Sequence, residues 1–209
     1  MTSKRDLSPR NKPVQERAQK QITKILKTTA QLLDQIGQDD LTTILVAKHA
    51  NISVGTLYHY FPNKYAIMYA LAEQWVDEME KAIQELEGES IENQSIKIFV
   101  EFSIQRILKV YLNQKGLLPL VQAMYGVPEL QELDNKHDDI VINGMARMFK
   151  RLGISTQESE LMRLGQAYLE ISHALLLVIV EKSAIVDNKT LADLKYLILC
   201  LLERAKGQF

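Results

Sequence analysis

The sequence predicts an all-helical protein, in which a small N-terminal three-helix domain precedes a larger helical domain, with about nine helices in total. Hydrophobic residues make up 46% and charged residues 24% of the 209-residue chain, which is typical of a folded globular protein. Apolar residues recur at helical spacing along most of the chain, and no stretch alternates cleanly between polar and apolar residues. Gly37, Gly88, Gly116 and Pro128 interrupt this pattern and divide it into segments.

The N-terminal part begins with a polar, basic tail over residues 1–13, in which two prolines oppose helix formation. The next segment, residues 14–36, places Ile22, Leu26, Leu33 and Ile36 on one face of a helix that ends before Gly37. We expect this face to pack over the two shorter helices that follow. The three helices would then form one domain over residues 14–66.

Residues 41–65 are predicted to form two short helices joined by a tight turn. Thr42 or Thr43 is a suitable N-cap for the first helix, and Ser53 is one for the second, which runs from about Val54 to Tyr60. Asn51 stands at the turn, because asparagine tolerates the left-handed backbone conformation that a sharp turn needs. This pattern is a helix-turn-helix, a motif whose second helix enters the major groove of DNA.

The solvent face of the second short helix lacks the lysine and glutamate that normally cover such a surface. It carries a glycine, a hydroxyl group, two phenols and an imidazole, from Gly55, Thr56, Tyr58, Tyr60 and His59. Small residues let the backbone approach a surface, and hydroxyl groups bond to base edges or phosphates. Residues 1–65 hold ten Lys or Arg against five Asp or Glu, whereas the remainder has a net charge of −6. This distribution favours nucleic-acid binding.

The same region resembles the DNA-binding domain of the TetR (tetracycline-repressor-like) family of bacterial transcriptional regulators, through Thr42-Thr43, Ala47, Ala50, Ser53, Gly55-Thr56-Leu57-Tyr58, Tyr60-Phe61 and Lys64. The resemblance covers residues 15–70. It implies groove or phosphate contacts from Thr42, Thr43, Ser53, Val54, Gly55, Thr56, Tyr58, His59, Tyr60 and Lys64. Val54 departs from the lysine that many members carry, so a methyl contact to thymine is expected there.

Residues 67–209 are predicted to form a helical ligand-binding and dimerisation domain. A helix that is capped by Asn63 and runs to about Glu87 is shared between the two domains, so it is the best-placed element to transmit a signal. Further helices are expected at residues 91–113, 117–125, 128–152, 156–184 and 190–206. The last two are apolar on nearly every side, which predicts a homodimer with a four-helix interface, or alternatively a leucine-rich monomer core. The resemblance implies the same dimer.

No motif identifies the ligand of this second domain. Polar and aromatic residues within its apolar helices are the candidates for a small-molecule pocket, and they are Trp75, Met79, Phe102, Arg106, Gln122, Tyr125, Asn143, Met145, Tyr168 and His173. Arg106 and His173 are favoured if the ligand carries a carboxylate, and Trp75, Tyr125 and Met145 if it is a flat hydrophobic molecule. The resemblance implies a repressor that a small, mostly apolar effector releases from a palindromic operator in double-stranded DNA.

Two other functions are an enzyme and a helical protein-interaction scaffold without DNA binding. A scaffold explains the apolar C-terminal helices but not the basic N-terminal part. His137-Asp138-Asp139 contains metal-ligand residue types, but consecutive helical residues point about 100° apart, so we expect this trio to be a solvated helix face. We therefore expect no metal, no cofactor and no catalytic site.

The remaining features predict a cytoplasmic protein. Cys200 is the single cysteine, lies in an apolar run and is expected to be buried in the core. The N-terminus lacks the apolar region of a signal peptide, and the longest apolar run, Ala174 to Val180, is shorter than the ~20 residues that a membrane helix needs. The basic tail either adds phosphate or minor-groove contacts or has no role in binding.

Overall fold

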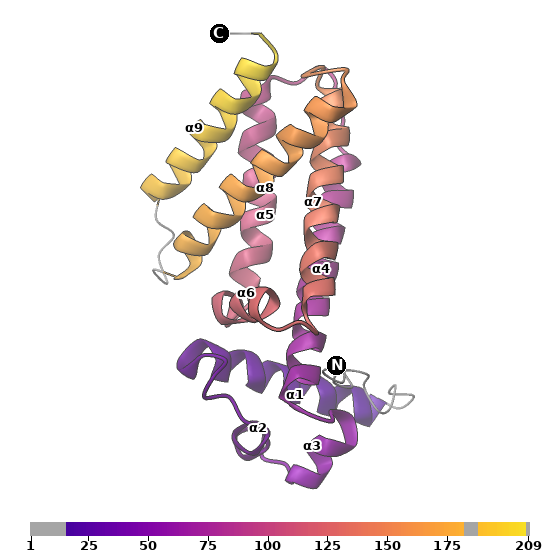
Figure 1. Ribbon diagram of the computed structural model, residues 1–209, viewed down its shortest axis with the longest axis vertical. Helices are drawn as coiled ribbons and strands as arrows, with labels where there is room; N and C mark the ends of the chain where they lie inside the picture. Colours follow the sequence, from indigo (N-terminus) through magenta and orange to yellow (C-terminus); the bar gives the residue numbers. More distant parts are fainter. Residues whose placement is uncertain (1–15, 182–187, 208–209) are drawn as a thin grey trace. The chain divides into compact units, whose positions relative to one another are not determined.

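The computed structural model describes residues 16–181 and 188–207, and the regular secondary structure of these residues is α-helical throughout. Nine helices follow one another along this part of the chain (Figure 1). They are α1 (Glu16–Ile36), α2 (Thr43–His49), α3 (Val54–Tyr60), α4 (Lys64–Glu87), α5 (Ile96–Asn113), α6 (Leu117–Gly126), α7 (Gln131–Arg151), α8 (Glu158–Glu181) and α9 (Asn188–Ala205). The predicted fold class is confirmed.

Two helices begin three or more residues later than the sequence predicts. α5 begins at Ile96 and not near residue 91, because Ser95 Oγ accepts a hydrogen bond from Ile98 N (3.3 Å) and caps the helix there. α7 begins at Gln131, so Pro128 lies in the preceding turn and not at the first helical position. The predicted basic tail, residues 1–13, and the end of the helix predicted over residues 156–184 lie outside the described residues.

The described residues divide into two compact units. The first unit extends to Trp75 and also includes Gln114–Asp134, so it contains α1, α2, α3, the first half of α4, and α6. α1 packs against both α2 and α6. The core of this unit is apolar and draws on all of these helices, through Ile25, Leu26, Leu33, Val46, Leu57, Phe61, Ile67, Leu71, Leu120 and Met124. The predicted boundary at residue 66 falls near the start of α4, which continues from the first unit into the second.

Gly116 is the residue at which α6 approaches α1. Its φ of 63° lies in the left-handed region. A Cβ atom at this position would lie 2.6 Å from the carbonyl oxygen of Ala30 and 2.8 Å from Leu33 Cβ. Glycine alone meets both requirements without strain, since it has no Cβ. This contact joins residues 114–134, which the sequence assigns to the second domain, to the unit that contains the helix-turn-helix.

The second unit consists of Val76–Asn113 and the described residues from Asn135 onwards. It contains the second half of α4, α5, most of α7, α8 and α9, and α8 packs against both α5 and α9. Aromatic rings connect its helices, with ring centroids 6.0 Å apart between Phe99 and Phe149 and 6.0 Å apart between Phe149 and Tyr168. Arg151 on α7 donates to the carbonyl oxygens of Glu87 (2.5 Å) and Glu89 (2.7 Å), which satisfies backbone acceptors at the end of α4.

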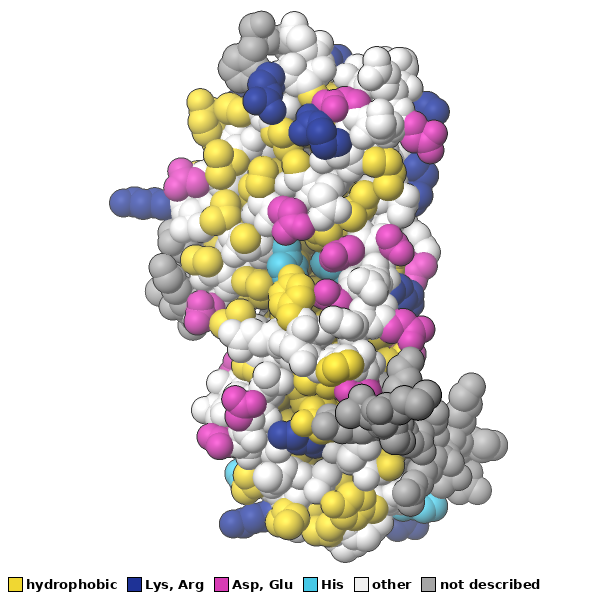
Figure 2. All heavy atoms as spheres, viewed as in Figure 1, with side chains coloured by type: hydrophobic (Ala, Val, Ile, Leu, Met, Phe, Trp, Pro, Cys, Tyr) yellow, Lys and Arg dark blue, Asp and Glu magenta, His cyan; other side chains and the backbone are white. Residues whose placement is uncertain are grey.

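α8 and α9 carry an apolar surface. α8 is long and apolar enough to cross a membrane, but buried core helices of soluble proteins meet the same criterion. In the most apolar 18-residue stretch of α8, 39% is buried inside the protein. Hydrophobic side chains gather over α8 and α9 on the face that Figure 2 shows. On α9, Tyr196 is 67% and Leu197 47% exposed. Cys200, which was expected to be fully buried, is partly exposed beside them.

Candidate functional site

The helix-turn-helix is fixed by short-range hydrogen bonds that the sequence predicts. Thr42 caps α2 by accepting a bond from Leu45 N (3.2 Å), and Ser53 caps α3 by accepting one from Thr56 N (3.0 Å). Asn51 has a φ of 49°, in the left-handed region, as the turn requires. The three local predictions are therefore confirmed, and they fix where α3 begins relative to α2.

The exposed surface of α3 presents polar groups without any acidic side chain. Gly55, Tyr58 and His59 are exposed, while Val54, Thr56 and Tyr60 are half-buried. A Cβ atom on Gly55 would meet only Ser53 Oγ within 4 Å, at 3.8 Å, so the backbone is open on this side. α2 and α3 contain no acidic residue, and α2 ends with Lys48 and His49. This surface can accept a polyanion without charge repulsion from its own helices.

The hydroxyl groups of this surface are joined in pairs. Thr43 Oγ1 and Tyr58 Oη are 3.0 Å apart and link the start of α2 to α3. Ser53 Oγ and Thr56 Oγ1 are 2.8 Å apart within the first turn of α3. Thr42 and Ser53, two of the residues expected to contact DNA, therefore use their side chains as helix caps, whereas Tyr58 keeps an exposed phenol.

Lys64, at the start of α4, is engaged inside the protein. Its ammonium group donates to the carbonyl oxygen of Gln38 (3.0 Å) and lies 3.5 Å from that of Asp39. These carbonyl groups follow the C-terminal end of α1, where a positive charge is favourable. The side chain therefore ties the α1–α2 turn to α4, a role that the resemblance does not imply.

The ten candidates for the ligand pocket are distributed over both units. Trp75, Gln122 and Tyr125 belong to the first unit, and the other seven belong to the second. Gln122 and Tyr125 are exposed, whereas Trp75, Met79, Met145 and Tyr168 are buried. Tyr168 Oη donates to Ser103 Oγ (3.4 Å), and burial raises the pKa of its phenol above the ordinary value.

Three of the remaining candidates lie at the edge of the second unit's core. Arg106 forms a partly exposed ion pair with Glu85 on α4. Asn143 donates its amide group to the carbonyl oxygen of Asp139 (2.7 Å) on its own helix. Phe102 is half-buried with its ring centroid 5.5 Å from that of Phe99. None of these three contacts involves His173.

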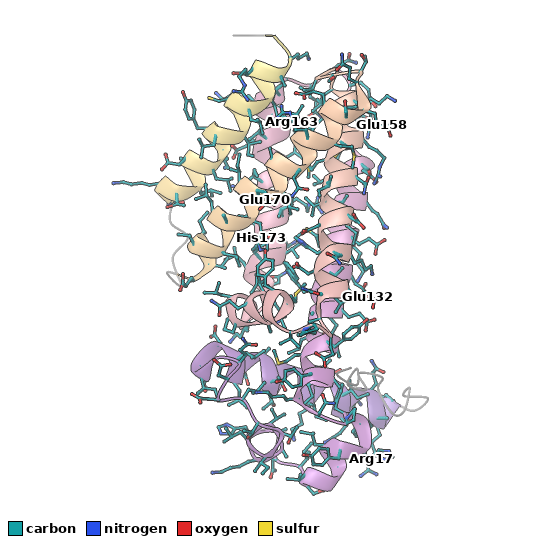
Figure 3. All side chains as sticks on the ribbon, viewed as in Figure 1. Arg17, Glu132, Glu158, Arg163, Glu170 and His173 are labelled. Carbon is teal, nitrogen blue, oxygen red and sulfur yellow. The ribbon has the colours of Figure 1, made fainter. Side chains whose placement is uncertain are left out.

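His173, on the C-terminal half of α8 (Figure 3), is instead part of a polar cluster drawn from three helices. Its Nδ1 lies 2.5 Å from the phenol oxygen of Tyr111 on α5. Its ring centroid lies 5.4 Å from that of His137 on α7, whose Nδ1 donates to Asp138 Oδ1 (3.0 Å). His137 is only 2% exposed, so the prediction that His137-Asp138-Asp139 is a solvated face is wrong for its first member.

This cluster is a polar region within an apolar unit. Burial and the neighbouring His137 lower the pKa of His173 to about 4, against an opposing effect of the Asp138 carboxylate. His173 is therefore an uncharged imidazole at neutral pH. Buried polar groups are costly unless they are hydrogen-bonded, and the Nδ1 atoms of His173 and His137 meet this requirement through Tyr111 and Asp138. Sequence reasoning identified His173 but missed Tyr111 and His137, since no local signal brings residues of separate helices together.

The fold and the capped α2–turn–α3 segment are those of a helix-turn-helix protein, and the described residues of its second unit also form helices. The family model "Bacterial regulatory proteins, tetR family" matches residues 25–71, and "Tetracyclin repressor-like, C-terminal domain" matches residues 95–202. The chain belongs to the tetR family of bacterial regulatory proteins.

Curated relatives and solved structures agree with this assignment. The HTH-type transcriptional regulator BetI of Stenotrophomonas maltophilia is 24% identical over 130 residues, which is 61% of this chain and 66% of that protein. BetI 1 of Chromohalobacter salexigens is 22% identical over 129 residues, or 61% of this chain and 64% of that protein. The aligned region thus spans slightly less than two thirds of both relatives.

The fold is shared with solved structures at low sequence identity. Salmonella enterica GusR aligns with a TM-score of 0.67 and 18% identity, covering 91% of this chain and 98% of that one. A putative transcriptional regulator from Pseudomonas aeruginosa PAO1 aligns with a TM-score of 0.69 and 14% identity, covering 94% and 96%. These likenesses show the fold.

Proposed function

We propose that this protein is a DNA-binding transcriptional regulator, most simply a repressor, which a small and mostly apolar effector releases from a palindromic operator. The observation that carries the proposal is the capped helix-turn-helix, whose second helix offers an exposed glycine, phenol and imidazole with no acidic side chain. In such a motif the second helix enters the major groove. Family membership supports the same function.

We assign different roles to the residues expected to contact DNA, according to the hydrogen bonds that their side chains already make. We assign groove contacts to Val54, Gly55, Thr56, His59 and Tyr60, because they occupy the face of α3 described above. The hydroxyl groups of Thr43 and Tyr58 are assigned to a phosphate. Thr42 and Ser53 support these contacts as helix caps.

Two recognition helices must act together to read a palindrome, so the proposal includes a homodimer. The helices α8 and α9 supply the interface, since they expose the large hydrophobic side chains of Met162, Tyr196 and Leu197. An isologous contact between two copies would cover this surface on both. The dimer would present its two α3 helices about one helical turn of DNA apart, ~34 Å or a multiple of it.

We assign the polar end of the effector site to the cluster of Tyr111, His137, Asp138 and His173. Ligand pockets are mostly apolar with a few convergent polar groups, and this cluster brings polar groups of three helices together within the apolar second unit. The effector would act by binding more tightly to the conformation that does not fit the operator. The helix α4, which is continuous from the first unit into the second, would carry the change.

Titration of the purified protein with fluorescent duplexes tests the DNA-binding function. One duplex has random sequence, and the other is selected by the protein from a random pool. We expect tight binding at low salt that weakens by about 10³ or more between 50 and 200 mM salt if six or more phosphates are contacted. The selected duplex should contain a palindrome. A monomeric protein that binds neither duplex at 50 mM salt would contradict the proposal and favour a protein-interaction scaffold.

A further inference from the structure

The hydrogen-bonding groups in the core of the second unit belong to three helices that pack together, α5, α7 and α8. Among the described residues, the buried polar side chains of this unit are those of Ser103, His137 and Ser172. Two buried phenols lie on the same helices. Tyr111 bonds to His173 Nδ1 (2.5 Å), and Tyr168 bonds to Ser103 Oγ (3.4 Å). The core of this unit therefore offers hydroxyl groups and imidazoles to a ligand.

This core holds no charged side chain in the part of the chain that the structure describes. Every described lysine, arginine, aspartate and glutamate of the second unit is at least partly exposed. A buried ion is costly unless an opposite charge and several hydrogen bonds hold it. A ligand that carried a charge among these helices would lose its hydration and would meet no buried counter-ion.

The Nδ1 contacts of the two histidines determine what their Nε2 atoms offer. In a neutral imidazole one nitrogen donates and the other accepts, and the bond made by one of them sets the role of the other. A phenol is more acidic than a neutral imidazole N–H, so Tyr111 donates to His173 Nδ1 and the hydrogen of His173 lies on Nε2. His137 donates from Nδ1 to Asp138, so the Nε2 of its neutral ring is an acceptor. The two rings, with centroids 5.4 Å apart, thus combine one donor with one acceptor.

We propose that the effector is an apolar molecule with an uncharged hydroxyl group, which donates to His137 Nε2 and accepts from His173 Nε2. This inference rests on the proposed function, in which the same cluster binds the polar end of the effector. A hydroxyl group is both a donor and an acceptor, so it matches both rings. A carboxylate only accepts and an ammonium group only donates, so each of them matches one ring and opposes the other.

The electrostatic surroundings of His173 also favour an uncharged ligand. Burial and the neighbouring His137 lower the pKa of His173 to about 4, so at neutral pH its ring supplies no positive charge to a carboxylate. The Asp138 carboxylate beside His137 repels an anion. Its side chain is 40% exposed, so water weakens its attraction for a cation.

Matched ligands with the same number of heavy atoms in an apolar chain test the proposal on the full-length protein. They are 1-octanol, methyl heptyl ether, octanoate and octylammonium at neutral pH. The rise of the thermal unfolding midpoint with ligand concentration gives each Kd. We expect 1-octanol to bind most tightly. The ether accepts but cannot donate, and should bind about tenfold more weakly. The two ions should bind about a hundredfold more weakly.

Two leucine variants assign the hydroxyl group to the two rings. His137→Leu removes the acceptor, so 1-octanol and the ether should bind equally. His173→Leu removes the donor that both ligands use, so both should bind about tenfold more weakly. His49→Leu, at an exposed position of α2 in the first unit, is the matched control and should leave both Kd values unchanged. If a leucine variant does not fold, Tyr111→Phe keeps the aromatic ring and should weaken both ligands, because it releases the His173 ring.

Failure of this proposal is distinguishable from failure of the DNA-binding function, because the unfolding assay contains no DNA. A protein that binds 1-octanol but no duplex would contradict only the proposed function. Tighter binding of either ion than of 1-octanol would overturn the hydroxyl assignment, as would equal binding of 1-octanol and the ether to the wild type. The same holds if no 1-alkanol from butanol to decanol shifts the midpoint, or if the shift survives both leucine variants. Finally, saturating 1-octanol should release bound duplex, and an unchanged duplex Kd would show that an alcohol is not the effector.

Discussion

The contact between Gly116 and α1 supports a prediction whose size follows from the geometry. Gly116→Ala introduces a Cβ atom at 2.6 Å from the carbonyl oxygen of Ala30 and 2.8 Å from Leu33 Cβ, so backbone must move. The left-handed φ of 63° adds a cost of about 1–2 kcal/mol for any residue with a Cβ. Forcing extra volume into a packed contact costs about 1–3 kcal/mol more. We therefore expect a loss of roughly 2–5 kcal/mol in the free energy of unfolding.

Gly37 provides a matched control in the same unit. It has a φ of 71°, but a Cβ atom there would meet nothing within 4 Å. Gly37→Ala should therefore cost only the conformational part, about 1–2 kcal/mol. The difference between the two variants in the free energy of unfolding reports the contact between α6 and α1, and we expect it to be roughly 1–3 kcal/mol.

Urea unfolding followed by far-ultraviolet circular dichroism measures both variants. A lower midpoint with an unchanged slope would report a loss of stability rather than a change in the unfolded state. Equal midpoints for Gly116→Ala and Gly37→Ala would refute the reasoning, because α6 would then not be held against α1 in solution. A Gly116→Ala protein that is less stable than Gly37→Ala, but that binds duplex normally, would limit the contact to a structural role.

Three other substitutions have defined expectations. Lys64→Met should leave the slope of log Kd against log salt unchanged, because its ammonium group is already donated to the carbonyl oxygen of Gln38; a phosphate contact would reduce the slope by about 0.9 per protomer. His173→Gln should flatten the pH dependence of stability between about pH 4 and 6.5. The unfolded chain binds the histidine proton with a pKa near 6.5 and the folded chain with one near 4, so the wild type loses about 3 kcal/mol as the pH falls through this window, and chemical denaturation at a series of pH values measures the difference. Leu197→Asp, on the exposed apolar part of α9, should convert the proposed dimer into a monomer in analytical ultracentrifugation. Asp193→Ala on the same helix should leave the dimer intact. A Leu197→Asp protein that stays dimeric would show that α9 is not part of the interface.

The features that the sequence predicted well depend on contacts between neighbours in the chain. The caps at Thr42 and Ser53 each involve a hydrogen bond to a residue three positions further on, and Asn51 adopts its turn conformation through its own side-chain preference. Helical periodicity then set most helix limits to within a few residues. The late start of α5 has the same kind of local cause, the Ser95 cap, which competed with the apolar pattern that suggested an earlier start.

The polar cluster could not be predicted, because its members are far apart in the sequence. Tyr111 and His173 are separated by 62 positions, and each lies on a helix face that reads as ordinary apolar core. Periodicity shows which face of a helix is buried but not which helix covers it. The sequence also predicted a solvated face for His137, because nothing in the sequence shows that another helix covers it. The ion pair of Arg106 is equally hidden from the sequence, because its partner Glu85 lies on another helix.

Residues 114–134 provide a second connection between the two units, in addition to α4. The sequence predicted that α4 is the best-placed element to transmit a signal, but the compact unit with the helix-turn-helix also contains α6, which lies in the chain between α5 and α7. The polypeptide therefore passes between the two units at three points, after Trp75, after Asn113 and after Asp134. A rearrangement of α5 or α7 around an effector would act on the first unit through the ends of α6 as well as through α4. The close approach at Gly116 would then pass such a change from α6 to α1, because α6 lies against Ala30 and Leu33 there.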